Sequence, residues 1–122
     1  MKFRSNCPIS SALDIVGDKW SLVIIRDLLY FDKKTFKELS NSLENIATNI
    51  LADRLKGLEE KGVLTRNDVQ DNKKTKHYKL TKKGLGLKPI LEELGKWSTS
   101  YVKNEHPKML SKKTFLEITH SN

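Results

Sequence analysis

Apolar residues recur at helical spacing in the first thirty residues of the chain. Pro8 suits the first turn of a helix, because its fixed φ matches and its missing N–H is not needed there. Gly17 predicts the end of this helix, whose apolar side comprises Ile9, Ala12, Leu13 and Val16. A second helix is expected from about Asp18 or Lys19 to Tyr30. Its inward-facing residues should be Trp20, Val23, Ile24, Leu28 and Phe31.

The next apolar stretches predict two short helices separated by a tight turn. Thr35 is placed to cap the first, with Glu38 three residues later in the spacing of a capping box. Its buried stripe should comprise Phe36, Leu39 and Leu43. After a turn at Glu44-Asn45, a helix over about residues 47–61 should bury Ile46, Ile50, Leu51, Leu55 and Leu58. Two helices joined in this way indicate a helix-turn-helix.

Beyond Gly62 the pattern of apolar and polar residues changes from one typical of helices to one typical of β-strands. Two short β runs, at residues 63–69 and 75–80, flank a polar turn. The second run alternates at its end, so Tyr78 and Leu80 should face inward while His77 and Lys79 stay in solvent. This pattern predicts a two-stranded β-hairpin over about residues 63–80, which has the shape of a wing.

The C-terminal third again has helical spacing. Thr81 can cap a segment over residues 82–87, and Pro89 restarts a longer helix over about residues 88–104. A bulky apolar stripe runs along this helix, made of Ile90, Leu94, Trp97 and Tyr101. We expect the stripe to contact a second copy of the chain, because a terminal helix has little of its own chain to cover; coverage of its own core is the alternative. An amphipathic piece over residues 109–118 follows.

Length and composition favour one small globular domain spanning residues 1–122. No apolar run approaches the roughly 20 residues that span a bilayer, so we expect a cytoplasmic protein without a membrane partner. Cys7 is the single cysteine, so the chain cannot form an internal disulfide. No other cysteine or histidine stands at the spacing of a zinc site. The three histidines accompany no nucleophile elbow or phosphate loop. We therefore expect no enzyme, no metal and no cofactor.

Positive charge is concentrated in one segment of the chain. The net charge is +8, and residues 61–83 hold eight basic and two acidic side chains, or +6. Such a field attracts a polyanion such as DNA, RNA or an acidic membrane, whereas a solvated lysine-rich face is the alternative. RNA is disfavoured, because Tyr78, the only aromatic residue of the hairpin, should point inward.

A helix-turn-helix followed by a basic hairpin matches the geometry of duplex DNA. The fourth helix would enter the major groove, and its exposed N-terminal residues would meet base edges: Thr48, Asn49, Ala52 and Asp53, with Arg54 nearby. Asn49 is the strongest candidate reader, because asparagine pairs bidentately with adenine. We favour a phosphate role for Arg54, since no acid lies three or four residues away. Lysines would neutralise phosphates, at Lys33, Lys34, Lys37, Lys73, Lys74 and Lys76; solubility is their alternative role.

Several separate motifs in this order resemble the HxlR-type regulators, a MarR-related branch of the winged-helix proteins. The resemblance covers roughly residues 7–101 and is carried by Cys7-Pro8, Gly17-Asp18-Lys19-Trp20, Phe36-Lys37-Glu38-Leu39, Ile46 to Leu55, Leu58-Glu59 with Gly62, and Tyr78 to Thr81 with Gly84. Asp18 stands where the family commonly has a second glycine, and His77 where it often has an acid. We expect that neither departure touches the proposed reading helix.

This resemblance implies a mainly α (α+β) winged helix-turn-helix with a two-stranded wing and N- and C-terminal dimerisation helices that interlock in a homodimer. It also implies, for some members, a sensor cysteine at the position of Cys7. The start of a helix and the nearby Lys2 and Arg4 would favour a thiolate there, whereas inert packing is the alternative. Any disulfide would join two subunits or a small thiol.

These patterns together predict a sequence-specific regulator that binds double-stranded DNA and responds to redox or electrophile stress or to a small ligand. An apolar ligand in a dimer crevice near Trp20 and Trp97 is one alternative input. A winged-helix module that binds proteins without reading DNA is the alternative function.

Overall fold

The computed structural model describes residues 1–70 and 72–120, and the side chains of all of these except residues 72 and 73. The chain divides into two compact units, residues 1–85 and 86–122, and each is described by itself. The single-domain organisation stays a prediction. No helix in the described residues is both long and apolar enough to cross a bilayer.

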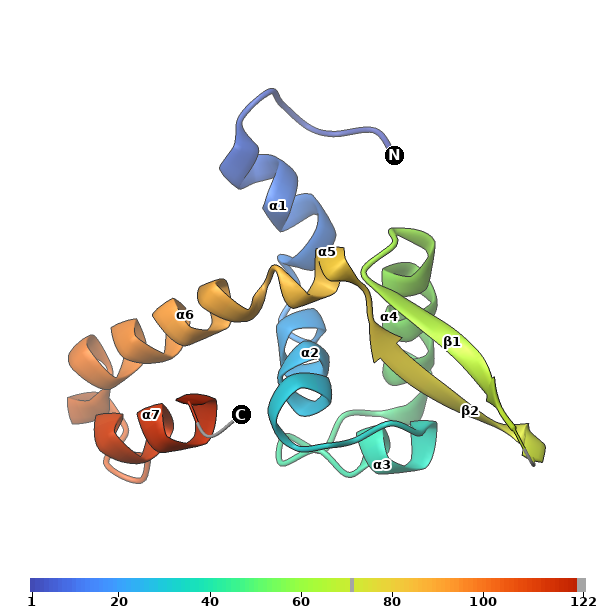
Figure 1. The fold of residues 1–122 in the computed structure, drawn as a ribbon. Helices are drawn as coiled ribbons and strands as arrows, with labels where there is room; N and C mark the ends of the chain where they lie inside the picture. The colour runs from blue at the N-terminus through green and yellow to red at the C-terminus, as the bar shows by residue number, and fades with distance from the viewer. Residues whose placement is uncertain (71, 121–122) are drawn as a thin grey trace. The chain divides into compact units, whose positions relative to one another are not determined.

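Four helices of the first unit follow the predicted order, α1 (Pro8–Val16), α2 (Ser21–Tyr30), α3 (Phe36–Ser40) and α4 (Thr48–Glu60) (Figure 1). Gly17 follows α1 as predicted, and a Cβ there would lie 2.3 Å from the carbonyl oxygen of Leu13. The regular part of α2 begins two to three residues later than expected. The Asp18 carboxylate explains this, since it accepts hydrogen bonds from the backbone N–H groups of Trp20 (3.0 Å) and Ser21 (3.1 Å) ahead of the helix.

The short helix α3 has the capping box that the sequence predicts. The Thr35 hydroxyl accepts from the Glu38 N–H (3.1 Å), and the Glu38 carboxylate accepts from the Thr35 N–H (3.0 Å). The prediction that Leu43 is buried was wrong, because α3 ends at Ser40 and Leu43 lies in the following loop, 81% exposed. Asn45, in the predicted turn, has a left-handed φ of 56°.

The core of the first unit is made by the end of α1, by α2, α3 and α4 with the turn before α4, and by the start of the hairpin. Its buried apolar residues are Val16, Ile24, Ile25, Leu39, Ile46, Leu51, Leu55, Leu58, Val63 and Leu64. Phe31, which was expected in this core, follows the last residue of α2 and is exposed, with the Arg26 guanidinium over its ring. Ile25 and Asp27 are almost fully buried and were missed, because α2 is enclosed on more than one side.

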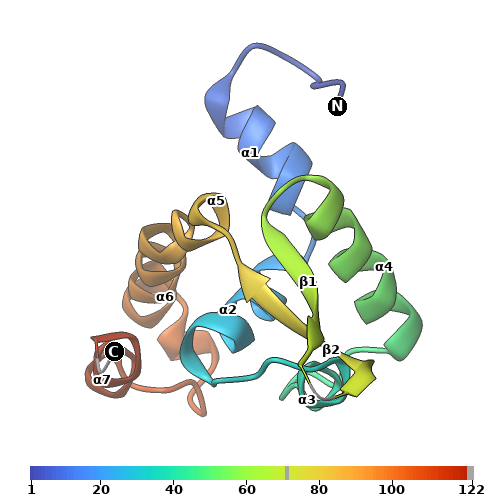
Figure 2. The same ribbon diagram turned by 45° about the vertical axis from the view of Figure 1, so that its right-hand side comes forward.

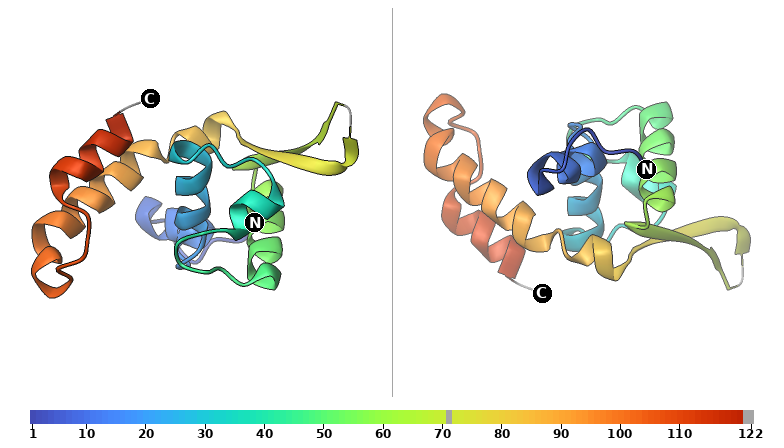
Figure 3. Two further views of the ribbon diagram at one scale, coloured as in Figure 1. Left: turned by 90° about the horizontal axis from the view of Figure 1, so that it is seen from below. Right: turned by 90° about the horizontal axis from the view of Figure 1, so that it is seen from above.

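The predicted hairpin forms from β1 (Leu64–Val69) and β2 (Asn72–Leu80), which pair antiparallel with Leu64 opposite Leu80 and Arg66 opposite Tyr78. Strand β2 begins three residues earlier than expected, and the register shifts between Asp68 and Val69. Tyr78 and Leu80 are half-buried while their neighbours His77 and Lys79 are exposed, which confirms the predicted alternation. Both views in Figure 3 show the hairpin projecting beyond α3 and α4, so it has the form of a wing.

The base of this wing is closed by Thr81 and the short helix α5 (Lys82–Leu85). The Thr81 hydroxyl donates to the carbonyl of Gly62 (2.6 Å) and accepts from the Gly84 N–H (3.2 Å), as the predicted cap requires. A Cβ on Gly84 would lie 2.2 Å from the Val63 carbonyl oxygen. Glycine is therefore needed where α5 crosses the start of the hairpin.

The second unit contains α6 (Lys88–Tyr101), a 3-10 turn η1 (Lys103–Glu105) and α7 (Lys112–His120). Helix α7 packs beside α6 at Gly95, where a Cβ would lie 2.0 Å from the Phe115 ring. No residue of α6 is buried, and the predicted stripe is exposed by 44 to 73%, at Ile90, Leu94, Trp97 and Tyr101. Because Gly95 and this stripe lie on different sides of α6, α7 leaves the stripe uncovered.

We predict that Gly95→Ala destabilises the packing of α7 by about 1–3 kcal/mol, since the Phe115 ring must move to admit the methyl group. The matched control is Gly57→Ala in α4, where a Cβ meets nothing within 4 Å. This control should be stabilising by about 0.5–1 kcal/mol through helix propensity. Amide hydrogen exchange of α7 and of α4 measures both effects, and equal protection of α7 in wild type and Gly95→Ala would contradict the packing argument.

Candidate nucleic-acid interface

The exposed face of α4 carries the residues predicted to read base edges. Thr48, Asn49, Ala52 and Asp53 are all exposed, while Leu51 and the rest of the apolar stripe face the core. Ala47 precedes the helix and supplies no side-chain cap. The first N–H groups of α4 therefore receive no cap from Ala47. They lie at the end of the helix where the backbone dipole favours an anion.

Helices α3 and α4 lie beside the wing, as Figure 2 shows. Two grooves lie between these helices and the wing, and Phe36 and Tyr78 line both of them. The first, of about 640 Å³, lies between the start of α3 and the wing and is lined by Thr35, Lys37, Ser40, Lys74, Thr75 and Lys76. The second, of about 450 Å³, lies between α4 and the wing and is lined by Ala52, Leu55, Lys56, Glu59 and Arg66. Cationic side chains therefore border both grooves.

The lysines predicted to contact phosphates differ in their surroundings. Lys34 and Lys37 are exposed, with Lys34 Nζ 3.8 Å from the Asp32 carboxylate. Lys74 is also exposed, and the Lys76 ammonium forms an ion pair with Asp68 across the hairpin. The side chain of Lys73 lies outside the described residues.

The Lys33 side chain, by contrast, is mostly buried and forms hydrogen bonds within the protein. Its ammonium donates to the buried Asp27 carboxylate (3.2 Å) and to the Asn41 carbonyl (2.8 Å), and its side chain is only 18% exposed. The local sequence gives no sign of this, because the partner Asp27 is six residues earlier on an apolar helix.

Two cations of the second groove, Lys56 and Arg66, were not among the predicted site residues. Both are exposed, and neither has an ion pair within the described part of the chain. Lys56 lies one helical turn after Ala52, so extending the predicted reading face of α4 by one turn would have included it. Arg66 lies opposite Tyr78 in the hairpin, so pairing the two predicted strands would have placed it beside Tyr78.

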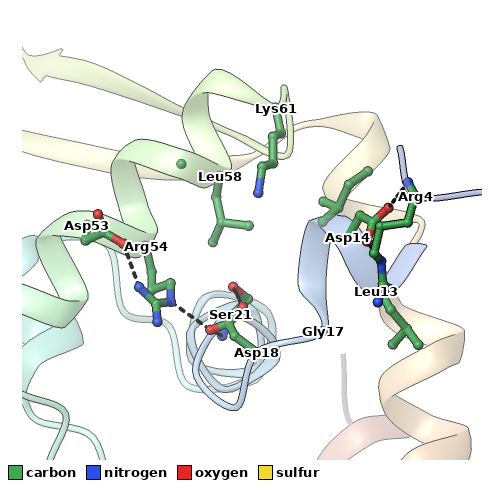
Figure 4. Close-up of a pocket in the computed structure, with 12 residues that line it drawn as sticks. Arg4, Leu13, Asp14, Gly17, Asp18, Ser21, Asp53, Arg54, Leu58 and Lys61 are labelled. Atoms are coloured by element: carbon green, nitrogen blue, oxygen red, sulfur yellow. Dashed lines mark hydrogen bonds and ion pairs between the residues drawn. The ribbon is translucent and has the colours of Figure 1, made fainter. Parts of the chain in front are cut away.

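Arg54 is bonded to two carboxylates, which corrects the expectation that it has no acidic partner. Its Nε donates to the Asp18 carboxylate (2.8 Å) and its Nη1 to Asp53 (2.6 Å), as Figure 4 shows. One partner is adjacent in sequence and the other precedes α2, so a search three and four residues away misses both. Asp18, which departs from the family pattern, therefore does touch the proposed reading helix.

The pKa of Asp18 reflects these contacts. Burial raises it, but the hydrogen bonds from the Ser21 hydroxyl, Arg54 and the N–H groups of Trp20 and Ser21 outweigh that effect, and the net pKa is lowered. Asp18 is thus ionised at neutral pH. The same contacts raise the pKa of Arg54, chiefly through its hydrogen bond to Asp18.

A network around Asp27 positions the helix-turn-helix. The Asp27 side chain is 1% exposed and accepts from Arg26 (2.8 and 3.0 Å) as well as from Lys33. Arg26 also donates to both oxygens of Glu44 (2.7 and 2.9 Å), which lowers the pKa of that carboxyl group. Because Glu44 lies in the turn between α3 and α4, the network fixes this turn to α2.

The start of α3 is joined to the wing. The Glu38 carboxylate accepts from the N–H groups of Lys34 (2.9 Å) and Thr35, and these two hydrogen bonds are the main reason that its pKa is lowered. The carbonyl of Lys34 in turn accepts from the N–H of Tyr78 (2.7 Å). The backbone before α3 and strand β2 are therefore hydrogen-bonded directly.

Cys7 is free and exposed and immediately precedes α1. Its N–H donates to the Ser5 hydroxyl (3.2 Å), and the nearby Arg4 guanidinium pairs with Asp14 of α1. Trp20, beneath the Lys19 ammonium, belongs to the first unit and Trp97 to the second. A ligand crevice near both tryptophans stays a prediction.

Comparison with known proteins gives a consistent set of similarities. The family model described as HxlR-like helix-turn-helix matches residues 15–106. The uncharacterized HTH-type transcriptional regulator YvaP of Bacillus subtilis is 36% identical over 97 residues, which are 79% of this chain and 89% of YvaP. The crystal structure of PA1607 superposes with a TM-score of 0.73 and 37% identity, over 80% of this chain and 67% of PA1607.

Reduced YodB, a transcriptional regulator from B. subtilis, superposes with a TM-score of 0.64 and 30% identity, over 80% of this chain and 95% of YodB. Quinone-bound and diamide-treated forms of YodB have also been solved. The matched structures agree with the mainly helical fold and its two-stranded wing. None of these findings favours a protein-interaction module that does not bind DNA.

We predict that Asp27→Asn destabilises the first unit by roughly 3 kcal/mol, because it leaves Arg26 and Lys33 beside a neutral buried group. The matched control is Asp32→Asn, since Asp32 is 91% exposed and has a left-handed φ of 51° that asparagine tolerates. This control should change the free energy of unfolding by less than about 0.5 kcal/mol. Urea denaturation measures both variants, and equal midpoints would refute the role given to Asp27.

Proposed function

We propose that this chain, which belongs to the HxlR-like helix-turn-helix family of transcriptional regulators, binds duplex DNA in a sequence-specific manner as a homodimer. The observation that carries the proposal is the exposed N-terminal face of α4 between two grooves bordered by cations. A helix of this kind fits the major groove, and a cationic wing fits the flanking backbone. A regulator of this kind acts where the DNA is, in the cytoplasm.

The proposed contacts divide by chemistry. Asn49 and Thr48 offer an amide and a hydroxyl to base edges, and Ala52 offers a methyl group to thymine. Phosphates would be neutralised by the cations around the grooves, which are the exposed Lys34, Lys37, Lys56, Arg66 and Lys74 and the partly buried Lys76. Lys33 drops out of this set, because its ammonium is bound internally.

Dimerisation is supported by the exposed stripe on α6. Trp97 and Tyr101 are 57% and 73% exposed, with ring centroids 6.1 Å apart, and α7 leaves both uncovered. On α1, Ile9 and Leu13 are similarly exposed, one helical turn apart. Large exposed apolar side chains in such rows mark interaction surfaces, and the family typically forms dimers. Two α4 helices would then enter successive major grooves about 34 Å apart.

The function is tested by selecting duplexes from a random library and measuring fluorescence anisotropy against scrambled DNA. We expect near-palindromic duplexes and two chains per duplex by sedimentation. Asn49→Ala should lose about 1–3 kcal/mol of binding to the selected duplex and relax base preference at one position. Lys37→Ala should weaken all duplexes alike and reduce the salt slope by about 1.

Lys108→Ala in the second unit is the matched control, since Lys108 is exposed and distant in sequence from the wing and α4. It should leave both duplexes almost unaffected. If no sequence is enriched, or if Asn49→Ala weakens selected and scrambled duplexes equally, specific recognition by α4 is refuted.

Regulation through Cys7 is supported by its exposure and by the similarity to YodB, which has been solved with quinone bound. A thiolate adds its electron pair to a quinone ring carbon, which forms a thioether and leaves the ring as the hydroquinone after proton transfer. This adduct needs no second cysteine. A disulfide would need a second thiol, either Cys7 of another chain or a small thiol, and the two thiols would give up two electrons and two protons to the oxidant.

We predict that a benzoquinone raises the mass of the wild-type chain by one quinone and weakens its binding to the selected duplex at least tenfold. Cys7→Ser should keep its affinity before and after the same treatment, because serine is not nucleophilic enough to form the adduct. Mass spectrometry and anisotropy give the two readouts. If Cys7→Ser still responds to the quinone, Cys7 is not the sensor, and a ligand bound elsewhere becomes the better explanation.

A further inference from the structure

Arg54 is a partly exposed cation on the recognition helix that two carboxylates hold in place. Its guanidinium lies between the carboxylates of Asp18 and Asp53, and its side chain is 33% exposed (Figure 4). Asp53 is adjacent to it on α4, whereas Asp18 comes from the turn between α1 and α2. The three side chains together carry a net charge of −1 beside the helix that is proposed to enter the groove.

Asp18 is held in place independently of Arg54. One carboxylate oxygen accepts from the N–H groups of Trp20 and Ser21, and the other accepts from the Ser21 hydroxyl (2.5 Å). These bonds place the carboxylate at the N-terminal end of α2, where a negative charge is favourable. Arg54 has the long, flexible side chain of the pair, so Asp18 sets where the guanidinium lies.

We propose that Asp18 is a specificity-determining residue, which holds the Arg54 guanidinium against the start of α2 and so withholds one cation from DNA phosphates. The inference rests on the proposed function of α4. Phosphate contacts raise affinity for every sequence alike, whereas base contacts distinguish sequences. Withholding Arg54 therefore lowers binding to random DNA and leaves base reading by Asn49 intact, which raises the ratio of specific to nonspecific affinity.

A purely structural role for the ion pair makes a different prediction. If Asp18 and Arg54 only join α2 to α4, breaking the pair should lower the stability of the fold and the affinity for DNA. If Asp18 withholds Arg54, breaking the pair should raise the affinity for random DNA. The sign of the change in affinity therefore separates the two roles.

The test is Asp18→Asn, measured by anisotropy on a random-sequence duplex from about 50 to 200 mM salt. Asparagine is a good helix cap, so α2 should keep its start, and Asp18→Ser provides a second capping variant. We expect tighter binding at low salt and a salt slope steeper by about 0.9, which corresponds to one added phosphate contact. Over this range, the affinity loss should be about three- to fourfold larger than for wild type.

The control is the same substitution in an Arg54→Gln background, where no guanidinium can be released. There the added slope should disappear, because the gain belongs to Arg54 and not to the removed negative charge. An unchanged slope in both Asp18→Asn and Asp18→Ser, or a gain that survives in full without Arg54, overturns the inference alone. A wild-type protein that binds no duplex at all overturns the proposed function as well.

Discussion

The arrangement of the helix-turn-helix depends on one buried carboxylate. Asp27 is almost fully enclosed on α2, and a charge in that position is tolerated only when it is paired and hydrogen-bonded. Its two partners reach outward in different directions, Lys33 to the carbonyl of Asn41 after α3 and Arg26 to Glu44 before α4. The hydrogen bonds that compensate the buried Asp27 carboxylate thus hold both ends of the turn between α3 and α4 against α2. The direction of the proposed reading face of α4 follows from this network.

Local patterns in the sequence predicted the parts of the fold that depend on near neighbours. The capping box of Thr35 and Glu38, the alternation around Tyr78 and the exposed stripe of α6 are each determined by residues within a few positions of one another. Element boundaries were less accurate. Leu43 was placed in the core because its spacing continues that of α3, but the helix stops at Ser40.

Contacts between distant residues were not predictable from the same patterns. Asp18 and Arg54 are 36 residues apart and meet only because the fold brings the turn before α2 next to α4. Nothing in the sequence around Lys33 distinguishes it from a surface lysine. Its interior role follows from the burial of its partner Asp27. In the candidate site, the exposure of Thr48, Asn49, Ala52 and Asp53 agrees with the helical periodicity of the sequence, while their role in reading bases stays a prediction. The roles of individual cations were not predictable, because a charge pattern does not show which charges are already paired.

The backbone hydrogen bond from Tyr78 to Lys34 bears on how such an interface could change over evolutionary time. It holds the wing to the segment before α3 without using any side-chain atom. Substitutions at exposed wing positions such as Arg66 can therefore accumulate without altering this backbone anchor of the hairpin. The wing and the proposed reading helix can consequently diversify as separate modules, and under the proposed function one would adjust general attraction to DNA and the other the preferred sequence.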